Sequence, residues 1–234
     1  MNPFFSHSGR LICVLLAFAP ATLHAQKQAA AASQTPAAKS APGSGSQQYT
    51  EQQMQEMISK LQDRIKNAAD AVIGRIQKEE SAVRLKYSYF RKAERLDPST
   101  YGSKEDVTAW RTSLQQFKEN ENGLDKLYAD AEPDLGNALI QQRINQAIAD
   151  QIKNELLKSF PWSVITKKSA LMRDFIAEHD ELLTFYDTNW GTWTVASGTA
   201  TFADAKLAAT FQDLKAKINA TGEQIDEQYK LMVQ

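Results

Sequence analysis

The chain has 234 residues, 27 basic and 28 acidic side chains, and a net charge of −1 at pH 7. This balance argues against nucleic-acid binding, which needs a concentrated basic surface. The length allows one large or two small domains.

The N-terminus has the pattern of a secretory signal peptide. Arg10 supplies a positive charge, and the apolar run at 11–19 (LICVLLAFA) is too short to span a bilayer. Cleavage fits best after Ala25 and less well after Ala21, while an uncleaved anchor is the open alternative. We therefore expect a signal peptide at 1–25 and an exported protein, periplasmic or extracellular, with no stable membrane span after cleavage.

The segment that follows differs from the rest of the chain. Cleavage would remove Cys13, the only cysteine, so no disulfide and no cysteine-ligated metal is expected in the mature protein. Residues 26–48 are rich in Ala, Gln, Ser and Pro and contain no aromatic or branched apolar residue. Such a segment cannot bury enough surface to offset its ordering entropy. We expect a disordered tail at 26–49 and a helical bundle domain at 50–234.

One long helix is predicted from Thr50 to Arg95. Its apolar residues recur at a mean spacing of 3.6 residues, the period of an α-helix with one buried face. They are Met54, Ile58, Leu61, Ile65, Ala68, Val72, Ile76, Val83, Tyr87 and Phe90. Thr50 and Gln53 match a capping box, and Asp97-Pro98 would end the helix. Its continuity through Gly74 is left open.

This helix would be about 68 Å long, more than any later helix can cover. A second helix folding back over its end would leave the early stripe uncovered. Large apolar side chains in such a row rarely remain exposed to water. The candidate interaction residues are therefore Met54, Ile58, Leu61 and Ile65. They would pair with another copy or with a protein partner; the alternatives are a break near Gly74 and cover by later helices.

Four more helices are predicted, at 103–130, 133–160, 162–189 and 207–232. The first has a heptad seam whose only polar member is Glu121, and the second carries Ile148 in the middle of its apolar stripe. The uncharged run 188–203 could be partly strand-like, but we expect a connection packed across one end of the bundle. The fold class is thus all-α, an antiparallel helical bundle of about five helices with coiled-coil features and one long N-terminal helix.

No residue pattern indicates catalysis or a cofactor. The nucleophile-elbow, phosphate-loop and haem-attachment motifs are absent from the sequence. The carboxylate pairs Glu79–Glu80 and Glu119/Glu121 are interpreted as solvent-facing. His179 points at the core without the second histidine of a di-iron bundle, so we expect a hydrogen-bonded or edge-exposed core histidine rather than a metal ligand. The expectation is no enzyme, no cofactor and no metal.

The aromatic residues Trp162, Tyr186, Trp190 and Trp193 form the best candidate ligand site, because Trp and Tyr combine apolar area with a polar group. An aromatic plug at the end of the bundle is the other interpretation. We expect a non-catalytic protein that acts through protein–protein contact, as a scaffold, adaptor or chaperone-like binder. The alternative is a small-molecule-binding bundle that uses the aromatic end.

The signal-peptide hypothesis predicts that the mature protein begins at Gln26. N-terminal sequencing of exported material should therefore show Gln26 as the first residue, since the apolar run is too short to remain as an anchor. An intact Met1 on protein from the membrane fraction would contradict it.

Overall fold

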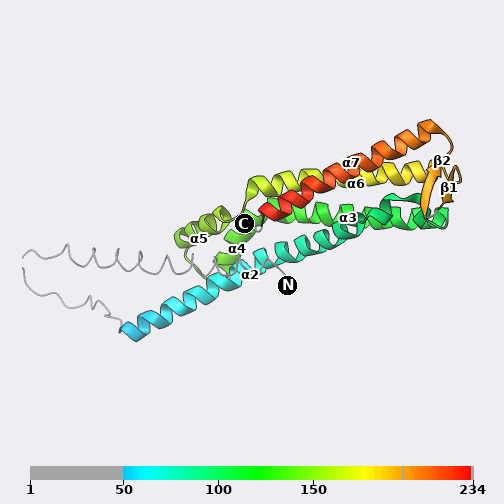
Figure 1. Cartoon of the computed structure of the whole chain (residues 1–234). Helices are drawn as coiled ribbons and strands as arrows, with labels where there is room; N and C mark the ends of the chain where they lie inside the picture. The colour runs from blue at the N-terminus through cyan, green and yellow to red at the C-terminus, as the bar shows by residue number, and fades with distance from the viewer. Residues whose placement is uncertain (1–49, 197, 233–234) are drawn as a thin grey trace, which may run out of the picture. The chain divides into compact units, whose positions relative to one another are not determined.

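The structure is a computed structural model that describes residues 50–196 and 198–232 (Figure 1). The predicted signal peptide (1–25) and tail (26–49) lie outside the described residues. Within the described part there are six α-helices and one two-stranded hairpin, so the predicted helical class is confirmed. None of these helices is long and apolar enough to cross a membrane.

Helix α2 (Glu51–Phe90) is continuous over 40 residues and passes Gly74 without a break. Its start is the predicted capping box, because the Thr50 hydroxyl accepts from the Gln53 N–H at 3.2 Å and the Gln53 side-chain oxygen accepts from the Thr50 N–H at 2.9 Å. The helix ends before the predicted Arg95. The chain then forms two short 3₁₀ helices, η2 (Ala93–Leu96) and η3 (Pro98–Thr100).

The chain divides into two compact units. The described residues of the first unit are 50–73 and 132–160. They comprise the first part of α2, α4 (Ala131–Gln141) apart from its first residue, and α5 (Gln146–Lys158). The second unit contains the rest of α2 with α3 (Lys104–Ala129), α6 (Trp162–Thr188), β1 (Trp193–Ala196), β2 (Thr199–Phe202) and α7 (Ala205–Leu231).

The prediction of one helix at 133–160 is wrong, because the chain breaks between α4 and α5. Arg143 adopts a left-handed φ of 59° at the break. Two hydrogen bonds close the end of α4 in a Schellman arrangement: Arg143 N–H to the Ile140 carbonyl at 2.8 Å and Ile144 N–H to the Leu139 carbonyl at 3.2 Å. The sequence gives no signal for this helix end, since glycine usually occupies the left-handed position and Arg143 occupies it here.

The break changes which isoleucines face the core of the first unit. Asn145 caps α5 by accepting a hydrogen bond from the Ala147 N–H at 3.0 Å. α5 therefore begins as a separate helix, and its buried face does not continue the buried face of α4. Ile152 is 4% exposed, whereas Ile140 is 40% and Ile148 36% exposed. The prediction that Ile148 is a core residue is therefore wrong.

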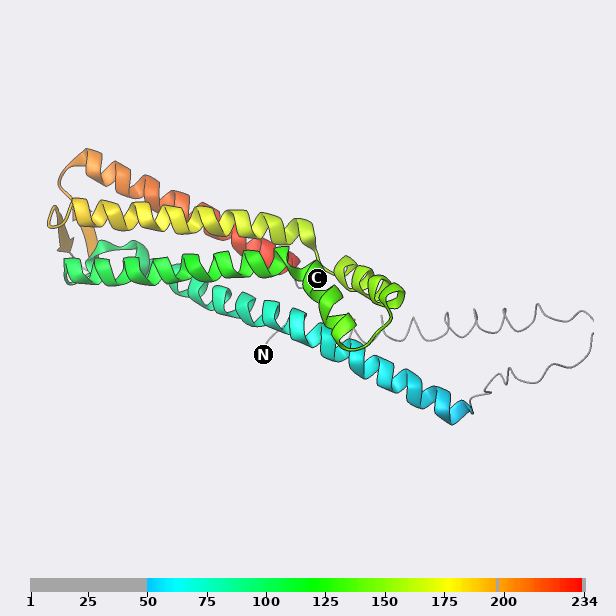
Figure 2. The ribbon, with the colours of Figure 1, turned by 180° about the vertical axis from the view of Figure 1, so that it is seen from behind.

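Four helices pack side by side in the second unit: the second part of α2, α3, α6 and α7 (Figures 1 and 2). Phe90 of α2 stacks on Phe117 of α3 and meets His179 of α6 edge-on, with centroid distances of 5.7 and 5.4 Å. Tyr87 of α2 lies 6.0 Å from Tyr229 of α7. Ring contacts thus join α2 to each of the other three helices.

The start and extent of α3 follow the sequence closely, but the connection before α7 does not. Ser103 and Asp106 form a capping box for α3, which continues through Gly123 as predicted. The run 188–203 contains an antiparallel hairpin, with Trp193 opposite Phe202, instead of a wholly irregular connection. Gly198, at φ 78°, supplies the positive φ that a tight hairpin turn needs.

The break between α4 and α5 predicts different costs for two isoleucine truncations. Ile152→Ala should lower the free energy of unfolding by about 2–5 kcal/mol, the usual cost of a core cavity. Ile148→Ala, the matched exposed control, should cost less than about 1 kcal/mol. Denaturant midpoints measure both, and equal losses would contradict the assignment of their faces.

Candidate functional site

A buried ion pair lies inside the second unit. Lys168 Nζ of α6 donates to both carboxylate oxygens of Glu80 of α2, at 2.9 and 2.8 Å. The two side chains are 0% and 2% exposed. Burying two charges costs several kcal/mol per ion, and their attraction offsets this cost only when further polar groups complete the site.

Two tyrosines complete the surroundings of this pair. The Tyr128 hydroxyl of α3 donates to a Glu80 oxygen at 2.8 Å. The Lys168 ammonium lies 5.8 Å from the ring centroids of both Tyr128 and Tyr229, within the range of a cation–π contact. Burial and the nearby Glu80 charge raise the pKa of Tyr128 far above its usual value, so it remains a hydrogen-bond donor. All four helices therefore contribute to this site.

Glu121 of α3 is a second buried carboxyl group beside the pair. It is 0% exposed, and neither of its oxygens has a hydrogen-bond partner in the described structure. Burial raises the pKa of Glu121 to about 7; the Lys168 charge and the Ser169 hydroxyl oppose this rise, while the Asp125 and Glu80 charges add to it. Glu121 therefore changes its charge near neutral pH. We call Glu80, Glu121, Tyr128, Lys168 and Tyr229 the buried polar cluster.

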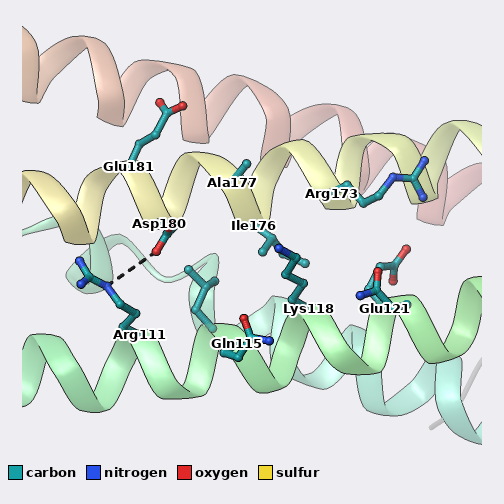
Figure 3. A pocket seen from close by; sticks show the side chains of 11 residues that line it. Arg111, Gln115, Lys118, Glu121, Arg173, Ile176, Ala177, Asp180 and Glu181 are labelled. Atoms are coloured by element: carbon teal, nitrogen blue, oxygen red, sulfur yellow. Dashed lines mark ion pairs between the residues drawn. The ribbon is translucent and has the colours of Figure 1, made fainter.

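A pocket of about 590 Å³ lies between α3 and α6 (Figure 3). This volume is within the range of small-molecule sites. Leu114, Ile176 and Ala177 form apolar parts of its lining, and Glu121 belongs to the lining as well. In Figure 3 the Lys118 side chain reaches from α3 toward Ile176 on α6. The pocket thus adjoins the buried polar cluster.

Four charged residues of the pocket lining belong to ion pairs that connect helices. These pairs are Arg111 with Asp180 (3.7 Å), Arg173 with Asp125, and Glu181 with Lys217 (3.4 Å). Arg111 also donates a hydrogen bond to the Thr184 hydroxyl at 3.2 Å. These contacts neutralise much of the charge around the pocket.

The four predicted ligand-binding residues do not form one site. Trp190 and Tyr186 lie 5.0 and 6.1 Å from Trp193 at the C-terminal end of α6. Trp162 lies at the other end of α6, about 36 Å away along the helix, and contacts Tyr128. The grouping of Trp162 with the other three is therefore wrong.

The three grouped aromatics form part of a packed end of the second unit. Tyr186 is 0% exposed, and its ring lies 5.4 Å from Tyr101 and 6.2 Å from Phe211. Phe202 of the hairpin packs against Phe211 at 5.2 Å. This arrangement matches an aromatic plug, and none of the four predicted residues lines the pocket between α3 and α6.

Three of the predicted interaction residues are half-buried, namely Met54, Ile58 and Leu61. No residue from 51 to 64 is fully buried, and the neighbouring Met57 is 45% exposed. Ile65 is only 5% exposed and belongs to the core. Its inclusion in an uncovered surface is therefore wrong, and we define the α2 apolar face as Met54, Met57, Ile58 and Leu61.

His179 is a hydrogen-bonded core histidine, as predicted. Its Nδ1 lies 2.9 Å from the Phe175 carbonyl and its Nε2 lies 3.1 Å from the Phe90 carbonyl. Burial lowers the pKa of His179 to about 4, so the ring is neutral at pH 7 and can donate only one of these bonds at a time. In the described part of the chain, no group of three His, Cys, Asp or Glu residues is placed to hold a metal ion.

The buried polar cluster was not predicted from the sequence. The interpretation of Glu80 and Glu121 as solvent-facing is wrong, since they are 1% and 0% exposed. Two signals were present: Glu121 is the only polar member of its heptad seam, and Lys168 interrupts the apolar face of α6. A buried carboxylate and a buried ammonium require each other, because neither is tolerated alone in a core.

Comparison with known proteins gives no relative for this chain. No protein-family model matches the sequence, and no curated protein or solved structure is detectably similar to it.

The raised pKa of Glu121 predicts a pH-dependent stability. Its folded-state pKa of about 7 lies above the ordinary 4.5, so its stabilising protonated form is fully present below about pH 4.5 and is lost as the pH rises through 7. Glu121→Gln should therefore stabilise the fold by about 2–3 kcal/mol more at pH 8 than at pH 5. Urea unfolding of both proteins at the two pH values measures this difference, and a pH-independent effect of the substitution would contradict it.

Proposed function

We propose that this is a non-catalytic protein that acts through protein–protein contact, using the α2 apolar face. The observation that carries the proposal is the incomplete cover of Met54, Met57, Ile58 and Leu61 at the start of a continuous helix. Apolar area left in water costs about 25 cal/mol per Å², so a partner that covers this face would gain that energy.

The spacing of the α2 apolar face suits recognition as a helix. Met54, Ile58 and Leu61 follow the i, i+4, i+7 spacing with which an amphipathic helix occupies an apolar groove or pairs with another helix. Exposed polar residues such as Gln55 and Ser59 occupy the other side. The contact would therefore be one-sided and directional.

The role that fits is a scaffold, adaptor or chaperone-like binder, with an antiparallel helical bundle as its support. The signal-like pattern at 1–25 is compatible with work outside the cytoplasm. A ligand site at the aromatic end has less support, because Tyr186 is fully buried within a plug. The occupant of the α2 apolar face is a protein surface, and a second copy is one outcome of the test.

The proposal predicts that charges on the α2 apolar face abolish association. Ile58→Lys with Leu61→Lys should remove crosslinked species in intact cells, because lysine cannot be buried in an apolar contact without a large cost. Mass spectrometry of the crosslinked material would identify the partner, and sedimentation of the purified protein would detect self-association.

The matched control is Gln55→Lys with Ser59→Lys, which adds the same charge to exposed positions of the same helix. The control should keep the crosslinks, and circular dichroism should show both variants folded. Equal crosslinking of a folded Ile58/Leu61 variant and the control would contradict the proposal.

A further inference from the structure

Two charged residues of the pocket between α3 and α6 lack partners. Arg111, Arg173, Asp180 and Glu181 are paired, as described above. Lys118 has no hydrogen bond or ion pair within the described chain, and neither Glu121 oxygen has a hydrogen bond there. The pocket lining therefore holds one unpaired ammonium and one carboxyl group without a donor.

The positions of these two groups explain why they can serve one ligand. Residues three apart on a helix lie on the same side, with Cβ atoms about 5–6 Å from each other. Lys118 and Glu121 are three apart on α3, but they form no ion pair with each other. Apolar parts of Leu114, Ile176 and Ala177 line the same pocket (Figure 3). A ligand that complements this pocket is a small molecule with one positive group, one negative group and an aliphatic part.

We propose that the pocket between α3 and α6 binds a small aliphatic amino acid as its zwitterion. Glu121 takes the ligand ammonium, Lys118 takes the ligand carboxylate, and the aliphatic part lies against Leu114 and Ile176. The volume of about 590 Å³ accommodates a ligand of this size. This site is separate from the α2 apolar face, so either proposal can fail without the other.

The buried state of Glu121 makes it a strong anchor. Neither oxygen of its carboxyl group has a hydrogen bond of good geometry in the described structure, although the nearby Ser169 hydroxyl lowers its pKa, so a ligand ammonium would supply a strong donor. Both oxygens are covered, so the proposal requires the Glu121 side chain to turn toward the pocket when the ligand binds. Such a rotation is a change of side-chain rotamer and leaves the helix in place.

Binding is coupled to the protonation of Glu121. Its surroundings hold charges of both signs and hydroxyl groups: Lys168 and Ser169 of α6, Glu80 of α2, Asp125 and Tyr128 of α3, and Tyr229 of α7. Burial keeps the pKa of Glu121 near 7, so part of the population is protonated at neutral pH. A ligand ammonium beside the carboxyl group favours its ionised form, and binding therefore releases a proton.

The test is calorimetric titration of the full chain at pH 7.0. The probes are L-leucine, 4-aminobutyrate and 6-aminohexanoate, which separate the two charges by different lengths. Leucinamide lacks the carboxylate, and 4-methylpentanoate lacks the ammonium. At least one zwitterion should bind at least tenfold more tightly than both single-charge analogues. The heat should depend on the ionisation enthalpy of the buffer in the direction of proton release.

Variants locate the site. Glu121→Gln and Lys118→Met should each weaken the best zwitterion at least tenfold, and Glu121→Gln should abolish the proton release. Lys126→Met, which removes the same charge from an exposed position of α3 outside the pocket, should leave binding unchanged. Three results would overturn the proposal: no zwitterion binds, a single-charge analogue binds equally well, or both pocket variants bind like the unaltered chain.

Discussion

The buried contact between Glu80 and Lys168 is the constraint on which the second unit depends. A charge pair without access to water is stable only in good geometry, and losing one partner leaves an uncompensated charge that costs about 3–5 kcal/mol. α2 and α6 must therefore keep a fixed separation and register at this point. Tyr128 of α3 and Tyr229 of α7 complete the site, so side chains from all four helices meet at this polar contact in the core.

Glu121 is the part of this arrangement that stability alone does not require. A heptad seam is most stable with apolar residues throughout, and a carboxyl group without hydrogen bonds is costly there. Local departures from the rules of packing are expected at functional sites. The position of Glu121, between the ion pair and the pocket of α3 and α6, links the stability of the core to the protonation of a group that can meet a ligand.

The first unit is distinguished by the apolar side chains that it leaves exposed. Its apolar contacts bury α2 from Ile65 onward, whereas the preceding turns leave Met54, Ile58 and Leu61 half-covered and Met57 exposed. Ile140 and Ile148 are also exposed in this unit. The buried face consists of Leu135 and Leu139 in α4 and of Ala149, Ile152 and Leu156 in α5, and both isoleucines lie outside it.

The sequence by itself determined the features that depend on nearby residues. The capping box at Thr50, the cap at Ser103, the continuity of α3 through Gly123 and the extent of α6 follow from local hydrogen bonds and from the helical period. Only the tertiary structure decided which polar residues on apolar faces meet. Glu80 and Lys168 are 88 residues apart, and Trp162 shares a helix with Tyr186 yet lies at its opposite end. Periodicity shows that a side chain faces inward, but its partner depends on how separate helices pack.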